Sequence, residues 1–130
     1  QALAEGCRRR MNAKSVLVAL DARMQEVYWG AYRVDETGRP VPIIDEAVLA
    51  PADVTVPEQV DWHAVGSGWG AYHDILKSRC PSLASVEPDA QVHAADVAQL
   101  AVAALAAGQT VRAENALPTY LRDQVAWAKS

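Results

Sequence analysis

The stretch that decides the fold is Val16–Asp35, VLVALDARMQEVYWGAYRVD. It begins with a continuous apolar run, Val16–Leu20, which is typical of a strand buried on both faces. The polar segment Asp21–Glu26 follows and predicts a turn. Val27–Val34 then alternates and carries large side chains on both faces. We therefore predict a β-hairpin at the start of a sheet that is covered, at least in part, on both sides.

Working outward, the sequence predicts an antiparallel three-strand meander followed by alternating helices and strands. Asp35–Gly38 is typical of a hairpin turn, with Gly38 suited to a positive φ. The later elements are a third strand over Val41–Leu49, a connection or short helical turn over Pro51–Pro57, a strand over Trp62–Val65, a helix over Ala71–Lys77, a strand within Ser82–Val92, a helix over Ala94–Ala107, and a short helical or extended segment over Pro118–Trp127. This order indicates an α/β fold with a mixed sheet, and the ribonuclease H-like core is one candidate for it.

The helix over Ala94–Ala107 is rich in alanine. We expect an apolar stripe of Val97, Leu100, Ala104 and Leu105, with Gly108 ending the helix. Because alanine permits close approach, we expect this helix to pack on the sheet.

The amino-acid composition limits the classes of protein to which this chain could belong. A chain of 130 residues with 51% hydrophobic and 22% charged residues is typical of one globular domain. The net charge of -4 disfavours autonomous nucleic-acid binding. Cys7 and Cys80 lack zinc-site spacing, so we expect free thiols. No apolar run reaches the roughly 20 residues of a membrane span. We therefore expect a soluble, cytoplasmic protein.

Two segments are candidates for cofactor binding. Asp21 follows a buried strand, where an aspartate of an actin-like lobe can bind magnesium or phosphate, although it can equally cap its own turn. The GSGWG segment, Gly66–Gly70, could offer backbone N–H groups to an anion, or it could be a tight strand-to-helix turn. It lacks the lysine of a phosphate-binding loop. We therefore name Asp21, Gly66 and Gly68 as the candidate residues.

Other polar residues form no recognisable catalytic pattern. His63, His73 and His93 are scattered, and no H-E-x-x-H motif occurs. Ser67 lies in Gly-Ser-Gly rather than in G-x-S-x-G. We therefore predict no catalytic residue, no metal ligand and no cofactor.

Three segments together resemble one family. They are ALDARMQEVYWGAYRVDETG at Ala19–Gly38, VGSGWGAY at Val65–Tyr72 and ALPTYLRDQVAW at Ala116–Trp127. In order and spacing they are similar to the bacterial TsaB (YeaZ) family, and the resemblance covers nearly all of the chain from about Val16.

The resemblance implies a ribonuclease H-like lobe of the actin-like ATPase type. Family members are nearly twice this long, so it also implies that residues 1–14 are the tail of an inter-lobe helix. Residues 15–130 would be the C-terminal lobe, with the N-terminal lobe absent from this chain. We then expect an exposed apolar patch near Ala2–Met11 and the aromatic strand.

The function implied by the resemblance is that of a non-catalytic scaffold subunit. It would support a TsaD-like partner, which transfers the threonylcarbamoyl group to tRNA, together with a TsaE-like ATPase. The resemblance allows a homodimer of the full-length protein, and we expect no membrane association and no direct contact of this lobe with tRNA. The alternatives are a glycoprotease-like hydrolase, which would need a metal-ligand cluster, and a nucleotide-binding lobe that uses Asp21 and Gly66–Gly70.

Overall fold

The computed structural model describes residues 1–58 and 61–122. Its elements, in chain order, are α1 (Ala2–Met11), β1 (Ser15–Asp21), β2 (Val27–Val34), β3 (Pro40–Pro42), β4 (Ala47–Leu49), a 3₁₀ turn (Pro51–Asp53), β5 (Trp62–Val65), α2 (Ser67–Ala71), α3 (His73–Arg79), β6 (Leu83–Glu87), α4 (Ala94–Ala106) and a second 3₁₀ turn (Ala113–Asn115).

The strands of the described residues form one mixed sheet in the order β3-β2-β1-β5-β6, with β4 also paired to β2. The predicted hairpin is present: β1 and β2 are antiparallel, with Ser15 opposite Arg33 and Asp21 opposite Val27. Strands β1, β5 and β6 run parallel to one another. The predicted fold class, a ribonuclease H-like lobe with a mixed sheet, is confirmed.

The predicted single strand over Val41–Leu49 is wrong, because two short strands take its place. Strand β3 pairs with the end of β2, with Tyr32 opposite Pro42, and β4 pairs with its beginning, with Val27 opposite Leu49. Two of the three residues of β3 are prolines, which lack the N–H that a ladder needs. A longer ladder is therefore unavailable at this position.

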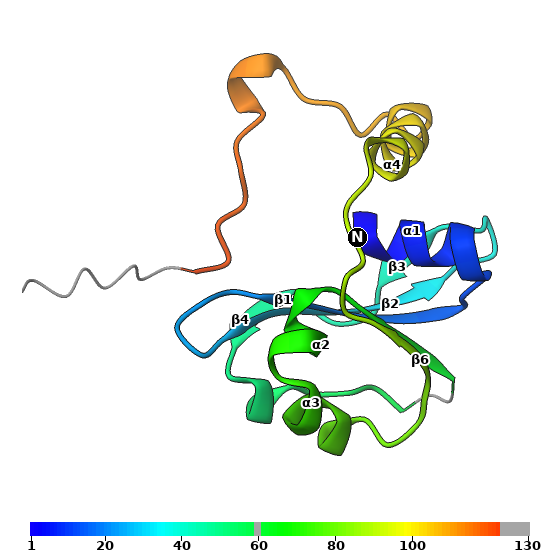
Figure 1. Cartoon of the computed structure of the whole chain (residues 1–130). Helices are drawn as coiled ribbons and strands as arrows, with labels where there is room; N and C mark the ends of the chain where they lie inside the picture. The colour runs from blue at the N-terminus through cyan, green and yellow to red at the C-terminus, as the bar shows by residue number, and fades with distance from the viewer. Residues whose placement is uncertain (59–60, 123–130) are drawn as a thin grey trace, which may run out of the picture.

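One face of the sheet is covered by α2 and α3 (Figure 1). The core on this side joins the alternate residues Leu17 and Ala19 of β1 to Trp62, Trp69 and Leu76. Trp69 also packs against Trp29, with ring centroids 6.0 Å apart. Burial of these large rings is the main apolar contribution to this half of the core.

The opposite face is covered by α1 (Figure 1). Leu3, Ala4 and Cys7 of this helix pack on Val16 and Val18 of β1. Cys7 and Cys80 belong to the cores on opposite faces, and both are free thiols, as predicted. Burial raises the pKa of both, that of Cys7 to about 11, so neither is a reactive thiolate at neutral pH.

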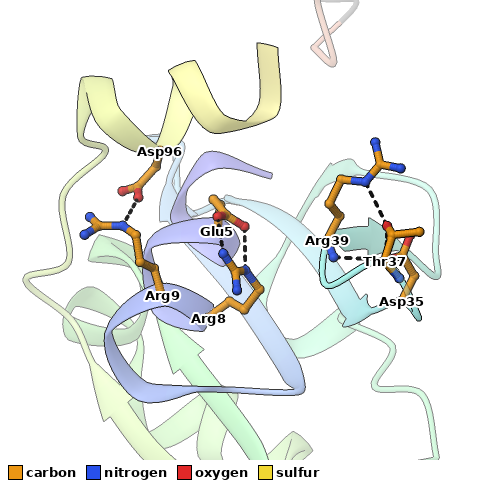
Figure 2. Close-up of polar contacts among 7 residues, drawn as sticks. All are labelled: Glu5, Arg8, Arg9, Asp35, Thr37, Arg39 and Asp96. Atoms are coloured by element: carbon orange, nitrogen blue, oxygen red, sulfur yellow. Dashed lines mark hydrogen bonds and ion pairs between the residues drawn. The ribbon is translucent and has the colours of Figure 1, made fainter. Parts of the chain in front are cut away.

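Helix α4 packs on α1, so its predicted packing on the sheet is wrong. Val97 and Leu105 are 48% and 67% exposed, which removes them from the predicted stripe, whereas Leu100 and Ala104 are half-buried. The orientation follows from Asp96, which is fully buried and accepts a hydrogen bond at 2.9 Å from Nε of Arg9 on α1 (Figure 2). The inward face of α4 thus combines this long-range ion pair with Leu100 and Ala104 of the predicted stripe.

The exposed patch expected near Ala2–Met11 and the aromatic strand is present in part, at Met11 and Tyr28. Leu3, Ala4 and Cys7 of α1 are buried, and on α1 and β2 the large exposed apolar side chains are Met11 and Tyr28. Apolar side chains with a greater exposed fraction lie further along the chain, on α4 and after it: Val97, Val102, Leu105, Val111, Leu117 and Tyr120.

Several boundaries of helices, strands and turns agree with those predicted from the sequence, and others differ. The turn at Asp35 closes with Gly38 N donating to Asp35 O at 2.9 Å, and Gly38 has a φ of 80°. The helix predicted over Ala71–Lys77 begins earlier, at Ser67, and is interrupted at Tyr72. Residues 118–122 form no helix or strand, and the rest of the segment predicted over Pro118–Trp127 lies outside the described residues.

The Arg9–Asp96 contact leads to a first prediction. Arg9→Ala leaves the buried Asp96 carboxylate without its cation, which costs about 2–3 kcal/mol because Arg9 itself is half-exposed. Since α4 contacts α1 through this region, amide hydrogen exchange should accelerate throughout α4 while β1 and β2 stay protected. The matched control is Arg10→Ala, which removes a surface pair with Glu87 and should cost under about 1 kcal/mol. Equal exchange in both variants would contradict the role of Asp96.

Candidate functional site

The structure brings the two candidate segments together. Asp21 is the last residue of β1, and Ser67 begins α2 just after β5. Because β1 and β5 are adjacent and parallel, their carboxyl ends lie at the same edge of the sheet. The backbone N–H of Asp21 donates to Oγ of Ser67 at 3.1 Å. The sequence identified both segments but did not predict that they meet.

The Asp21 side chain is engaged by its own turn. Its Oδ1 accepts a hydrogen bond at 2.9 Å from the backbone N–H of Arg23, and its Oδ2 lies 3.5 Å from Nη1 of Arg23. An aspartate that accepts the N–H two residues ahead forms an Asx turn. The carboxylate of Asp21 therefore caps the β1–β2 hairpin, which is one of the two roles that the sequence left open.

Gly66 and Gly68 allow the β5–α2 turn to cross β1 closely. Gly66 has a φ of 106°, and a Cβ there would lie 2.5 Å from the carbonyl oxygen of Ala19. A Cβ on Gly68 would lie 2.9 Å from Cβ of Ala19. The N–H of Gly66 donates to Glu87 O at 3.0 Å, so it is not offered to an anion. These contacts favour a structural role for both glycines.

The tip of the β1–β2 hairpin has a conformation that the sequence did not predict. Arg23, Met24 and Gln25 have φ values of 62°, 53° and 63°. Three consecutive left-handed residues without a glycine are costly, at about 1–2 kcal/mol each. Glu26 N donates to Arg23 O at 3.0 Å within the tip, and Glu26 forms an ion pair with Arg122. The tip therefore presents Arg23 and Met24 outward in a defined backbone conformation.

The histidines form no metal cluster. In residues 1–58 and 61–122, no group of three or more His, Cys, Asp or Glu side chains could hold a metal ion. Nδ1 of His63 lies 2.8 Å from Oγ of Ser85 on the neighbouring strand. Ser85 also contacts Sδ of Met11, at 3.9 Å, so this pair lies beneath the end of α1.

Two cavities lie elsewhere on the described part of the chain. One, of about 390 Å³, lies between Arg10 and the loop after β6, which includes His93. The other is a groove of about 240 Å³ on the α1 side of the sheet, lined in part by Leu20, Tyr28 and Tyr32. Neither is lined by Asp21, Gly66 or Gly68.

In the described part of the chain, no helix is long and apolar enough to cross a bilayer.

Comparison with known proteins confirms the resemblance seen in the three segments. Residues 1–130 match the family described as TsaD, tRNA N6-adenosine threonylcarbamoyltransferase. The chain is 41% identical to the tRNA threonylcarbamoyladenosine biosynthesis protein TsaB of Escherichia coli K12, over 98% of this chain and 56% of that protein.

Two solved structures from Pseudomonas aeruginosa are also similar. One is an uncharacterized protein with similarity to peptidase YeaZ, with a TM-score of 0.83 and 40% identity over 93% of this chain and 55% of that one. The other is YeaZ, with a TM-score of 0.81 and 38% identity over 92% of this chain and 55% of that one. The chain thus spans about half the length of the relatives it matches.

The glycine contacts lead to a second prediction. Gly66→Ala forces an alanine into a left-handed conformation against the Ala19 carbonyl, so we expect the free energy of unfolding to fall by about 3 kcal/mol. The control is Gly38→Ala, where φ is also positive but nothing lies within 4 Å of the added Cβ. That variant should lose only about 1 kcal/mol. Urea denaturation measures both, and equal losses would contradict the close crossing at β1.

Proposed function

Because this chain belongs to the TsaD family, tRNA N6-adenosine threonylcarbamoyltransferase, we propose that it acts in tRNA threonylcarbamoyladenosine biosynthesis as part of a non-catalytic scaffold subunit in the cytoplasm. The observation that carries the proposal is the 41% identity to TsaB along 98% of the chain. Residues 15–130 would be the C-terminal ribonuclease H-like lobe of that subunit, and residues 1–14 the end of an inter-lobe helix.

The geometry at the end of β1 supports a scaffold rather than an enzyme. In an active lobe, an acidic residue at this edge needs free oxygens for a metal or phosphate-bound cation. Both oxygens of Asp21 face Arg23, and the N–H of Gly66 is taken by Glu87. The groups that would form a nucleotide site instead stabilise the turn of the hairpin and the turn between β5 and α2.

The partners in this proposal are a TsaD-like transferase and a TsaE-like ATPase. A subunit without its own catalytic groups contributes by binding and positioning a partner, so the modification reaction should depend on its presence. The TsaD-like partner would then carry out the chemistry, and this lobe would make no contact with tRNA.

Reconstitution tests this proposal. TsaD-like and TsaE-like proteins, tRNA and a threonylcarbamoyl donor are incubated with or without the whole subunit that contains this lobe, and modified adenosine is measured by mass spectrometry. We expect the yield to depend on the subunit and to be unchanged, within about twofold, by Asp21→Asn, because asparagine can also cap an Asx turn. E. coli TsaB with its own partners is the positive control. Equal yields with and without the subunit would overturn the scaffold role.

The meeting of Asp21 with Ser67 favours one alternative, a nucleotide-binding lobe. Calorimetry with ATP and magnesium distinguishes the two functions. We expect no heat of binding at millimolar ligand, because the Asp21 carboxylate and the Gly66 N–H already have partners within the chain. A saturable heat that Asp21→Asn abolishes would instead support the nucleotide site.

A further inference from the structure

Two cavities beside the start of α1 share a wall that is formed by Tyr32 and Glu46. One is the groove of about 240 Å³ described above, and the other has a volume of about 410 Å³. Both are lined by these two residues together with Gln1 and Leu121. Tyr32 on β2 is 2% exposed, whereas Glu46 precedes β4 and its side chain is 45% exposed. A buried phenol and an accessible carboxylate therefore face the same space.

The groove joins this polar wall to an apolar floor. Tyr28, Gly30 and Tyr32 alternate along β2, so they lie on one face of the sheet, and all three line the groove. Leu20, which is opposite Tyr28 on β1, lines it as well. A Cβ on Gly30 would lie 3.0 Å from the ring of Tyr32, so the ring lies across this glycine. The groove is therefore suited to an aliphatic stem.

The side chains that line the two cavities have a negative charge. The acidic ones are Glu46 and, in the larger cavity, Asp45. In the part of the chain that the structure describes, no lysine, arginine or histidine lines either of these two cavities. A carboxylate in partly apolar surroundings attracts a cation more strongly than a carboxylate in open water does. Charge complementarity therefore favours a cationic ligand.

One ammonium group already lies at this wall, that of Gln1. It donates to Oη of Tyr32 at 3.0 Å, and its nitrogen lies 3.7 Å from Oε1 of Glu46. Oη of Tyr32 in turn donates to Glu46. The wall thus offers an ammonium both an acceptor and a counter-charge. An extension before residue 1 would replace this ammonium by a peptide N–H and leave the carboxylate without a cation.

The Gln1 ammonium can be replaced without loss of the wall itself. Burial lowers the pKa of this ammonium, and this effect outweighs the opposing influence of Glu46. Burial raises the pKa of Tyr32, and the neighbouring Glu46 raises it further, so the phenol stays protonated. Because the bond from Tyr32 to Glu46 does not involve Gln1, the two residues keep their arrangement when another cation takes its place.

We propose that the wall and the groove form a binding site for a primary ammonium group on an aliphatic stem, the chemistry shared by a lysine side chain and a free aliphatic amine. The ammonium donates to Glu46 and to Oη of Tyr32, while the stem lies against Leu20. Tyr28, which is 36% exposed, attracts the charge through its aromatic ring. The site is independent of the role in tRNA modification.

An NMR titration of the chain with n-butylammonium tests the site, with n-butanol as the neutral ligand of similar size. We expect saturable shifts of the signals of Tyr28, Gly30 and Tyr32 with the ammonium, and no saturable shifts with the alcohol. For so small a ligand the Kd should be about millimolar. Acetylation of Gln1 should tighten binding several-fold, because it removes the competing ammonium. Equal shifts with both ligands would overturn the proposal.

Two substitutions test the carboxylate and the ring separately. Glu46→Gln keeps the shape of the side chain but removes its charge, and it should weaken binding about tenfold. The matched control is Glu36→Gln, because Glu36 is exposed and lines neither cavity. Tyr28→Leu, which keeps an apolar side chain, should weaken binding about threefold. If Glu46→Gln binds n-butylammonium as tightly as Glu36→Gln does, the site is ruled out.

Two larger probes distinguish the sources of the ammonium. Nα-acetyl-lysine methylamide represents a lysine within a polypeptide, and diaminobutane represents a free aliphatic amine. Tighter binding of the first supports the site and assigns it to a polypeptide partner. Tighter binding of the second supports the site and assigns it to a free amine, whose second ammonium can approach Asp45. If neither probe binds the acetylated chain at up to about 0.1 M, the proposal is wrong.

Discussion

Strand β1 is covered on both faces, and the rest of the lobe is arranged by that constraint. Its odd residues, Leu17 and Ala19, face the tryptophan-rich core, while Val16 and Val18 face α1. Ala19 is small, which lets the β5–α2 turn come close enough that a Cβ at Gly66 would meet its carbonyl oxygen. That approach in turn places Trp69 against Trp29. The glycines, the crossing turn and the aromatic core thus follow from one buried strand.

The parts of the fold that depend on local patterns could be predicted from the sequence, and the parts that depend on distant partners could not. The apolar run of β1 and the alternation of β2 define the hairpin by periodicity alone. The inward face of α4 is different, because it depends on Asp96 finding Arg9, 87 positions away. A prediction based on hydropathy places an aspartate on the exposed face of a helix. For that reason it placed Val97 and Leu105, rather than Asp96, in the core.

The candidate site likewise has features that could be predicted from the sequence and features that could not. Residue type and position were enough to select Asp21, Gly66 and Gly68, because acidic residues and glycines at strand ends commonly either form a turn or bind a ligand. Whether those groups are free to bind a ligand depends on contacts that only the folded chain contains. Ser67, Glu87 and the Ala19 carbonyl supply these contacts. The left-handed tip at Arg23–Gln25 gave no sequence signal, since it contains no glycine, asparagine or aspartate.

The hairpin tip explains why Asp21 is poorly suited to a second task. Three consecutive left-handed residues persist only if the surrounding contacts compensate for their cost. One such contact is the hydrogen bond from Arg23 N to the Asp21 carboxylate, and another is the ion pair between Glu26 and Arg122. A cation that displaced the Arg23 N–H from Asp21 would remove a contact that compensates for this strain, so the loss of that contact would weaken its binding. A ligand at this carboxylate would therefore share it with the N–H of Arg23 that holds the turn.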